Sequence, residues 1–391
     1  MTASPDVLVV GAGVIGSWTA LRAAERGRRV GLVDAFGPGD ARATSGDESR
    51  ITRASHGTDR LYPTWSRESR LAWIELGEAT GSPIFEPCGV AWFARSDAGF
   101  EADSEATLRA LGIPVEHVSP DEAARRWPIR ADDLAFVLHE PEGGALRARQ
   151  GVRAAAAAVE RLGGTVGRAR VVPGRAADRR LLDVVTESGE RLAAAVFVFA
   201  AGPWLASLFP AALGERISVT RQDVLYLGVP PGDPRWSATT HPCWIDYGAE
   251  FYGVPSIDGR GFKVAPDAYG PPADPDTLDR LIAPASITAT RAFLARRFPA
   301  LAAAPVVETR VCQYETTPDT HWLIDRHPDL DNVWLVGGGS GHAFKHGPRI
   351  GQYVVDRLDG VADPEVDARF SLARPREPGH YGAPPRPAPT R

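Results

Sequence analysis

The stretch Val7-Leu-Val-Val-Gly-Ala-Gly-Val-Ile-Gly16 decides the fold of the first part of the chain. Its four apolar residues predict a short buried strand, and the glycines that follow predict a tight turn. The next residues, SWTALRAAERG, predict a helix that ends near Gly27, and Val30 to Val33 predict a second buried strand ending in Asp34. Strand, glycine turn, helix and strand together form a βαβ unit typical of dinucleotide binding.

Each glycine of this motif has a separate task in a dinucleotide site. Gly11 permits the tight turn, Gly13 lets the backbone approach a pyrophosphate, and Gly16 lets the helix pack closely on the strand. The helix N-terminus faces the phosphates, and Asp34 is placed to accept hydrogen bonds from both ribose hydroxyls, which excludes NADP. The motif alone does not separate NAD from FAD, and its simplest alternative is an ordinary glycine-rich turn.

Composition bounds the kind of protein. The 391 residues, 43% of them hydrophobic, suffice for two domains with real cores. The 44 basic and 49 acidic residues give a net charge of −5 without a block of like charge, so we expect no nucleic-acid partner. The start of the chain lacks the pattern of a secretory signal, and the most apolar stretch, residues 193–209, is interrupted by Gly202 and Pro203. We therefore expect a cytoplasmic protein without a membrane partner.

Cysteine and lysine are both rare. Cys88, Cys243 and Cys312 lie far apart in the sequence and form no C-x-x-C pair, so neither a disulfide framework nor a zinc site is expected, and no metal site is predicted. Only two of the 44 basic residues are lysines, Lys263 and Lys345.

The dinucleotide-binding pattern returns twice later in the chain. An apolar strand at 196–201 leads into the turn 200–204, and a strand at 333–336 leads into a glycine-rich turn and a helix. We therefore expect an α/β fold in which a Rossmann-like domain is interleaved with an α+β substrate domain that has a mixed or antiparallel sheet. The expected boundaries are 1–86, 145–215 and 305–370 for the first domain, 87–144 and 216–304 for the second, and 371–391 for a Pro-rich disordered tail. Further expected elements are helices at 62–77, within 144–163, at 276–298 and up to residue 357, and a strand at 88–94.

Motifs spread along the chain resemble the FAD-dependent amine and amino-acid oxidases of the D-amino-acid oxidase superfamily. Within it, the resemblance is to the branch of monomeric sarcosine oxidase, N-methyltryptophan oxidase and pipecolate oxidase, over most of residues 5–365. The resemblance implies FAD rather than NAD as the cofactor. The motifs are GAGVIG (11–16) with Asp34, SGDESRITR (45–53), FYGVP (251–255), GFKV (261–264), ADPDT (273–277), VCQY (311–314) and GSGHAFKHG (339–347).

The resemblance assigns the rare residues. Cys312 matches the cysteine whose sulfur is bonded to the 8α carbon of the flavin; without the motif, an inert buried thiol is the simplest alternative. Lys263 matches a lysine near flavin N5 that stabilises negative charge during oxygen reduction. Lys345 matches the lysine that binds the substrate carboxylate, with Arg53 as its partner. Surface charges are the alternative for both lysines.

Asp267 departs from the family pattern, because sarcosine oxidases carry a histidine at this position. A carboxylate facing the substrate would favour a cationic amine or accept its proton, whereas the alternative is a turn aspartate beside Pro266. This difference favours a larger secondary amine acid, cyclic or N-methylated, over sarcosine. Tyr252 follows the family's active-site tyrosine, with packing as its alternative. Arg50 is expected close to the flavin.

The expected function is FAD-dependent oxidation of the C–N bond of a secondary amine carrying a carboxylate to an imine, with O2 reduced to H2O2. The alternatives are a flavin dehydrogenase that uses another acceptor, a catalytically silent flavoprotein, and an NAD dehydrogenase. A monomer is expected, with a dimer as the alternative. The predicted catalytic residues are Lys263, Arg50, Asp267 and Tyr252, and the predicted substrate-binding residues are Arg53, Lys345, Tyr252 and Asp267. The predicted cofactor-binding residues are Gly11, Gly13, Val14, Ile15, Gly16, Asp34, Ala35, Arg42, Ser45, Ser49, Arg50, Val171, Ala201, Gly202, Trp204, Cys312, Gly339, Gly341, His342 and Lys345.

Overall fold

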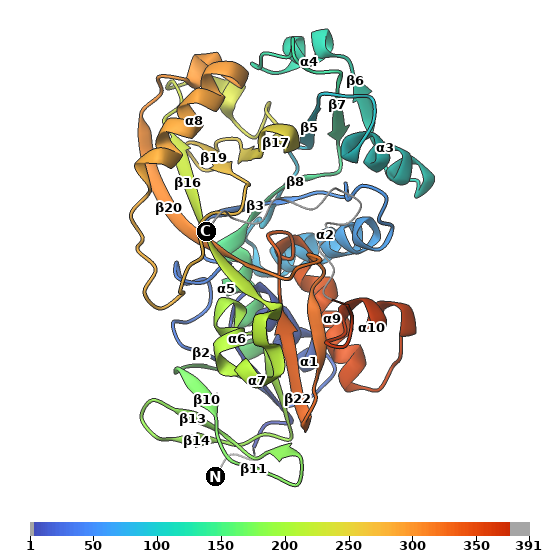
Figure 1. Cartoon of the computed structure of the whole chain (residues 1–391), viewed down its shortest axis with the longest axis vertical. Coiled ribbons are helices and arrows are strands. Elements are labelled where there is room, and N and C mark those ends of the chain that lie inside the picture. Colours follow the sequence, from blue (N-terminus) through green and yellow to red (C-terminus); the bar gives the residue numbers. More distant parts are fainter. Residues whose placement is uncertain (1–3, 376–391) are drawn as a thin grey trace.

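Two large sheets, one above the other in Figure 1, organise the protein. The computed structural model describes residues 4–375. The six-stranded sheet lies in the lower half of the view and the eight-stranded sheet in the upper half. The strands of the six-stranded sheet, in spatial order, are β21 (Leu323–His327), β22 (Leu330–Gly337), β15 (Val196–Phe199), β1 (Val7–Val10), β2 (Val30–Asp34) and β9 (Thr165–Arg168).

The six-stranded sheet contains the predicted βαβ unit. β1 lies between β2 and β15 and pairs with both in parallel, while β21 closes one edge antiparallel to β22. Alternate residues of β1 enter two different cores, as expected of a strand buried on both faces. Val7 and Val9 pack with α1 (Val14–Glu25), α5 (Ala148–Arg161) and α9 (Gly347–Leu358), and Leu8 and Val10 join the core on the other face.

The eight-stranded sheet is mixed. Most neighbouring strands pair antiparallel, but β17 and β5 pair in parallel. Helix α8 (Pro284–Arg297) packs on this sheet through Phe293, which joins Trp244, Phe262 and Phe298 in an aromatic core. In spatial order the strands are β20 (Val306–Thr316), β16 (Ser218–Leu227), β19 (Phe262–Pro266), β18 (Phe251–Val254), β17 (Cys243–Asp246), β5 (Val90–Ala94), β7 (Phe136–Glu140) and β6 (Glu116–Val118).

A small sheet and a long helix connect the two halves. In this sheet β8 (Gly144–Arg147) lies between β3 (Ser49–Thr52) and β4 (Phe85–Glu86), and the long helix is α2 (Leu61–Thr80). Two short antiparallel sheets lie at the lower end, formed by β10 (Val171–Pro173), β13 (Val184–Thr186) and β14 (Arg191–Leu192) and by β11 (Ala176–Ala177) and β12 (Arg180–Leu181). The remaining helices are α3 (Phe100–Ala110), α4 (Pro120–Arg126), α6 (Leu205–Leu208), α7 (Pro210–Leu213) and α10 (Pro364–Phe370).

The structure corrects one helix expected from the sequence. A helix at 276–298 was expected, but α8 begins only at Pro284. Proline fits the first turn of a helix and not its interior, because it lacks the backbone N–H and clashes with the preceding turn. The Asp276 side chain instead accepts hydrogen bonds from Trp204 and Arg170.

The domain boundaries stay a prediction, although both large sheets combine distant parts of the chain. β20, placed with the first domain in that division, pairs with β16 in the eight-stranded sheet. Of the expected tail, residues 376–391 lie outside the described residues. Among residues 4–375, no helix is both long and apolar enough to cross a membrane.

Candidate active site

A cavity of about 330 Å³ lies at the carboxyl ends of β1, β2 and β15. One part of its wall carries Asp34, Phe36, Val171 and Trp204, and another carries Arg50, Tyr314 and Phe344. Its lining also includes these predicted cofactor-binding residues: Gly11, Gly13, Val14, Ile15, Ala35, Ser45, Ala201, Gly202, Gly339 and Gly341. The crevice at the carboxyl ends of parallel strands is where doubly wound α/β proteins bind ligands.

The glycine turn leaves no room for larger side chains. Gly11 has a φ of +104°, and a Cβ there would lie 2.3 Å from the Ala200 carbonyl oxygen. A Cβ at Gly16 would lie 1.8 Å from the Gly11 carbonyl oxygen, which agrees with the close packing expected there. Asp34 fixes the same turn, because its carboxylate accepts a hydrogen bond of 2.7 Å from the Ala12 backbone N–H.

A buried group of charges lies beside the cavity. Asp47 accepts hydrogen bonds from Arg50 at 2.9 Å and from the Tyr226 hydroxyl at 2.8 Å, and it forms an ion pair with Lys263. Burial opposes ionisation of Asp47, but the charges of Lys263 and Arg50 outweigh burial and hold the pKa of Asp47 below its usual value. Lys263 also donates to the Ser49 carbonyl at 2.9 Å. This network fixes both cations.

Cys312 lies next to this charge group. Its Sγ atom is 3.6 Å from the Arg50 guanidinium and 3.5 Å from the Thr44 carbonyl oxygen. Both Arg50 and Thr44 line the cavity. The sulfur therefore lies just behind the wall of the cavity, in contact with two residues that line it.

A second, smaller pocket of about 90 Å³ adjoins the first. Five residues line both: Arg50, Tyr314, Ser340, Gly341 and Phe344. Aromatic side chains form much of its remaining wall: Trp92, Phe100, Tyr247 and Tyr252. The two cavities are neighbours across a shared wall, so ligands in them would lie close together.

Two cations face the smaller pocket. Lys345 is buried and donates to the His342 carbonyl at 2.9 Å, while Arg53 donates to the Ser55 carbonyl and lies 4.9 Å from the centre of the Trp92 ring. Within residues 4–375 neither cation forms a salt bridge to a carboxylate. Burial, followed by the charge of Arg53, lowers the pKa of Lys345 well below its usual value. Such a pair of cations favours an anionic ligand.

Asp267 contributes an acidic group to the same pocket. It lines the small pocket with Tyr252, and the Tyr314 hydroxyl donates to its carboxylate at 3.4 Å. Burial raises the pKa of both tyrosines, so both remain hydroxyl groups at neutral pH. The pocket thus presents cations, a carboxylate and phenol groups to one small ligand.

The sequence that forms both cavities matches a known protein family. The family model for FAD-dependent oxidoreductases matches residues 6–357. The chain belongs to this FAD-dependent oxidoreductase family. The predicted family resemblance, the α/β fold class, the enzyme class and FAD as cofactor are thereby confirmed.

Relatives of this FAD-dependent oxidoreductase align with it over almost their full length. Monomeric sarcosine oxidase of Bacillus sp. (strain B-0618) is 29% identical over 384 residues, covering 95% of this chain and 96% of that protein. N-methyl-L-tryptophan oxidase of Yersinia pestis (strain Pestoides F) is 25% identical over 374 residues, covering 94% and 99%. Fructosamine oxidase (Amadoriase II) of Aspergillus fumigatus shares the fold, with a TM-score of 0.81, 21% identity and coverage of 95% and 90%.

The larger cavity fits the FAD of this oxidoreductase family. The backbone around Gly11 and Gly13 and the first turn of α1 would hold the pyrophosphate, because helix N-termini favour anions. Asp34 would lie at the ribose, and Arg50, Phe344 and the backbone of 339–341 would lie around the flavin ring.

Five predicted site residues of the flavoenzyme line neither cavity: Gly16, Arg42, Ser49, Lys263 and Cys312. Lys263 and Cys312 lie just behind the wall, in contact with its charge group, and Ser49 accepts a hydrogen bond from Lys263. Arg42 is the farthest from its predicted role: its side chain is 47% exposed, pairs with Asp40 and lies over the Phe36 ring. His342 and Lys345 line the small pocket rather than the large one.

Sequence reasoning overlooked two acidic groups of the site. Asp47 stands within the quoted SGDESRITR segment, so its position beside Arg50 was a signal. Glu315 lines the large cavity, accepts a hydrogen bond from the Gly339 N–H at 3.4 Å, and has a pKa that burial raises to about 7. It directly follows Tyr314 of the VCQY motif, but its role depends on a cavity that the sequence alone does not display.

Proposed function

We propose that this flavoenzyme oxidises the C–N bond of a small secondary amine that carries a carboxylate, giving an imine. One observation carries this proposal: Arg53 and Lys345, which form no salt bridge in the described part of the chain, face a pocket that shares a wall with the larger cavity. The names of the relatives, sarcosine oxidase and N-methyl-L-tryptophan oxidase, support an N-methylated amino-acid substrate.

In this proposal the substrate carboxylate binds between Arg53 and Lys345. The negative charge of the substrate offsets the repulsion between the two cations and favours the protonated form of Lys345 against the burial that lowers its pKa. With the carboxylate fixed, the amine and its α-carbon lie toward Tyr252, Asp267 and the shared wall. Positioning of this kind lowers the barrier because the reacting groups no longer have to find each other.

Asp267 is proposed to bind the amine nitrogen. Its carboxylate accepts a hydrogen bond from a protonated secondary amine, or takes the proton that must leave before the amine is oxidised. An aspartate here therefore favours a cationic substrate. The aromatic wall of Trp92, Phe100 and Tyr247 favours an amine larger than sarcosine, such as a cyclic imino acid or an N-methylated aromatic amino acid.

FAD supplies the chemistry that the side chains lack, since it accepts two electrons from the amine and passes them to an electron acceptor. We propose O2 as that acceptor, so that amine and O2 give imine and H2O2. Lys263 and Arg50 are fixed cations that stabilise developing negative charge near the flavin ring. Asp47 holds both in place and compensates one of their two charges.

We also propose that Cys312 forms a thioether with the 8α carbon of the flavin. The new S–C bond would replace the thiol S–H bond and one C–H bond of that carbon, and the two electrons released would pass to the same acceptor, O2. The position of its Sγ at the cavity wall, beside Arg50 and Thr44, supports this link. Such a bond would keep the cofactor in place and withdraw electron density from the ring. A monomeric state and a cytoplasmic location stay predictions alongside this proposal.

The test begins with the absorbance spectrum of the purified protein before and after acid precipitation. We expect flavin to remain with the precipitated wild type and with Cys88→Ser, the matched cysteine control, and to leave Cys312→Ser. Flavin released from the wild type would contradict the thioether while leaving the oxidase proposal intact.

The substrate and acceptor are tested separately. Sarcosine, N-methyl-L-tryptophan, L-proline and L-pipecolate are mixed with the protein without oxygen, and bleaching of the flavin shows which amine reduces it. Air is then admitted, and H2O2 is measured. Bleaching without H2O2 formation would indicate a dehydrogenase with another acceptor, and no bleaching by any carboxylated secondary amine would contradict the proposed substrate class.

A further inference from the structure

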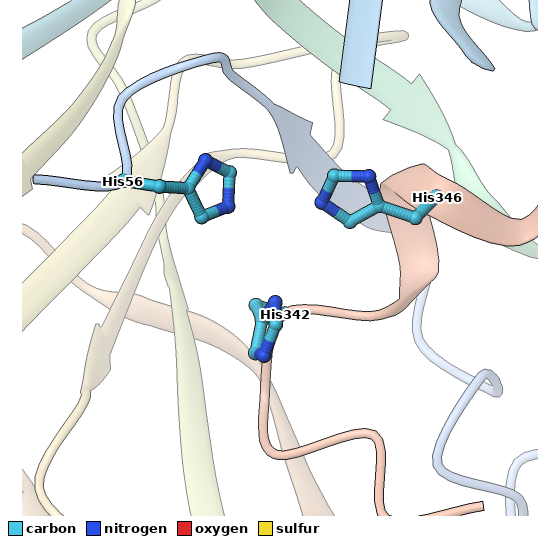
Figure 2. Close-up of side chains that lie close together, drawn as sticks. All are labelled: His56, His342 and His346. Carbon is cyan, nitrogen blue, oxygen red and sulfur yellow. The ribbon is translucent and has the colours of Figure 1, made fainter. Parts of the chain in front are cut away.

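Three histidines gather beside the small pocket, whose lining includes one of them, His342. His56 lies in the loop after β3, and His342 and His346 lie in the turn that precedes α9. All three are buried, with 0%, 5% and 0% of their surface exposed. Figure 2 shows their rings turned toward one common space. One ring nitrogen from each lies within 4.8 Å of the other two.

Hydrogen bonds to backbone carbonyls fix how two of these rings are protonated. His56 Nδ1 lies 2.8 Å from the Ala54 carbonyl oxygen, and His342 Nε2 lies 3.0 Å from the Thr320 carbonyl oxygen. A carbonyl only accepts hydrogen bonds, so each of these nitrogens carries the proton and the other nitrogen of the ring carries the lone pair. A histidine whose second nitrogen donates to a carbonyl is the usual arrangement of a metal ligand.

Burial and nearby charges favour the neutral form of the histidine rings, including His346. Both nitrogens of His346 are buried, and a hydrogen bond to the Trp65 backbone raises the pKa of the ring by less than burial lowers it. Burial, followed by nearby positive charges including Lys345 and Arg53, holds the pKa of His56 and His346 well below the usual value for histidine. Neutral imidazole is the form that binds metal ions.

The geometry requires only a modest contraction. The ring centres lie 6.0, 5.5 and 6.2 Å apart. Three histidines on a tetrahedral ion with N–metal bonds of about 2.0–2.1 Å have nitrogens roughly 3.4 Å apart, so nitrogens now within 4.8 Å of one another must approach by up to about 1.4 Å. The Tyr62 and Trp322 rings pack against the cluster and form an apolar shell around it.

We propose that His56, His342 and His346 bind one late first-row transition-metal ion, for which Zn²⁺ is the probe. Three neutral nitrogens suit Zn²⁺, Ni²⁺ or Cu²⁺, whereas Mg²⁺ and Ca²⁺ require oxygen ligands. Arg53 and Lys345 repel a cation at this place. Glu140 offsets part of that charge, because it is buried, acts on Lys345, and accepts hydrogen bonds from the Ala54 and Ser55 N–H groups that lead into His56.

The metal site would join the two segments that carry Arg53 and Lys345, the residues proposed to bind the substrate carboxylate. His56 follows Arg53 by three residues, and His346 directly follows Lys345. An ion bound by all three histidines would tie the loop after β3 to the turn before α9. It would thus fix the spacing of Arg53 and Lys345 without taking part in the oxidation.

The experiment uses the flavin-loaded full chain with any affinity tag removed. The protein is treated with EDTA, freed of chelator, mixed with ZnCl2 and desalted, and bound zinc is measured by mass spectrometry. We expect one zinc per chain in the wild type and in His327→Ala, which alters a partly exposed histidine outside the cluster. We expect at least about tenfold weaker zinc binding in His346→Phe and His56→Gln.

Two zinc-binding results and one spectroscopic result would overturn the proposal. The first two are a wild type that retains no zinc, and variants of normal flavin content that bind zinc as tightly as the wild type. The Co²⁺ spectrum of the wild type decides the ligands even if a variant fails to fold. Nitrogen ligation supports the histidine cluster. Sulfur-to-metal charge transfer would instead place the ion at Cys88 and Cys243, whose Sγ atoms lie 3.7 Å apart, and would also overturn the proposal.

Discussion

The two cavities of this protein are lined by different kinds of residue. The lining of the larger cavity includes several glycines and other small residues, at Gly11, Gly13, residues 200–202 and residues 339–341. The small pocket is bounded by long side chains, among them Arg53, Trp92 and Lys345. At a glycine such as Gly11 the backbone comes close to its neighbours, and an added Cβ finds no space. A wall of side chains is adjusted one residue at a time.

The largest loss of stability is expected when a side chain is added at a glycine of the larger cavity. Gly11→Ala places a Cβ 2.3 Å from the Ala200 carbonyl oxygen at a φ of +104°. We expect destabilisation of about 4 kcal/mol or more and loss of most of the bound flavin, measured by thermal unfolding and by the ratio of flavin to protein absorbance. Gly37→Ala is the matched control: its φ is +97°, but nothing lies within 4 Å of the new Cβ, so only about 1–2 kcal/mol of backbone strain is expected. Equal loss in both variants would contradict the role of close approach.

A smaller effect, confined to one step, is expected in the side-chain wall. Lys345→Met removes a buried cation from the small pocket, and we expect kcat/KM for a carboxylated amine to fall by about two to three orders of magnitude while the flavin is retained. The rate of anaerobic flavin bleaching measures this step. Arg67→Met, which alters a half-exposed arginine, serves as control. A change below threefold in Lys345→Met would remove Lys345 from the substrate site.

The larger cavity also contains Glu315, whose contribution to the free energy of unfolding depends on pH. Burial raises the pKa of Glu315 to about 7 from an ordinary value of 4.5. Below pH 4.5 the group is neutral in both the folded and unfolded states. Between pH 4.5 and 7 only the unfolded state loses the proton, so stability falls as pH rises, by about 3 kcal/mol in total.

Glu315→Gln removes this titration. We therefore expect the unfolding free energy of the variant to exceed that of the wild type increasingly from pH 5 to pH 7.5, as measured by urea unfolding. Parallel curves for the two proteins over this range would show that Glu315 does not titrate there.

The mildest effect is expected at Asp267, in the adjustable wall. Asp267→Asn keeps the shape of the side chain but removes a charge-assisted hydrogen bond to a cationic amine, so KM should rise about tenfold with little change in flavin content. The measurement compares KM of the variant and wild type for the best amine found. Asp97→Asn, on the exposed surface, is the control. An unchanged KM would support the interpretation of Asp267 as a turn residue.

The same difference explains what could be predicted from the sequence. The glycine motif specifies local geometry, so β1, the turn, α1 and Asp34 at the end of β2 lie where it placed them. The family resemblance then supplied the residues around the small pocket. The helix expected at 276–298 is present from Pro284 to Arg297, and only its expected start was wrong, because proline fits the first turn of a helix and not its interior.

Contacts between residues far apart in the chain could not be predicted from the sequence. The ion pair of Asp47 with Lys263 joins the segment before β3 to the eight-stranded sheet, and no local pattern announces it. The gathering of His56 with His342 and His346 has the same origin. Such groups become visible only when the fold brings their segments together. Cys88 and Cys243, far apart in the sequence, likewise lie side by side.

The order of strands in the six-stranded sheet has a consequence for how the protein is made. β1 lies between β2 and β15, and β22 joins β15 only when about 327 further residues have been added after β1. At 5–20 residues per second, this interval lasts roughly 15 to 65 seconds. During that time the apolar edge of the nascent sheet is exposed. Newly made chains should therefore depend on chaperones, and truncation before β22 should give aggregates rather than a smaller folded protein.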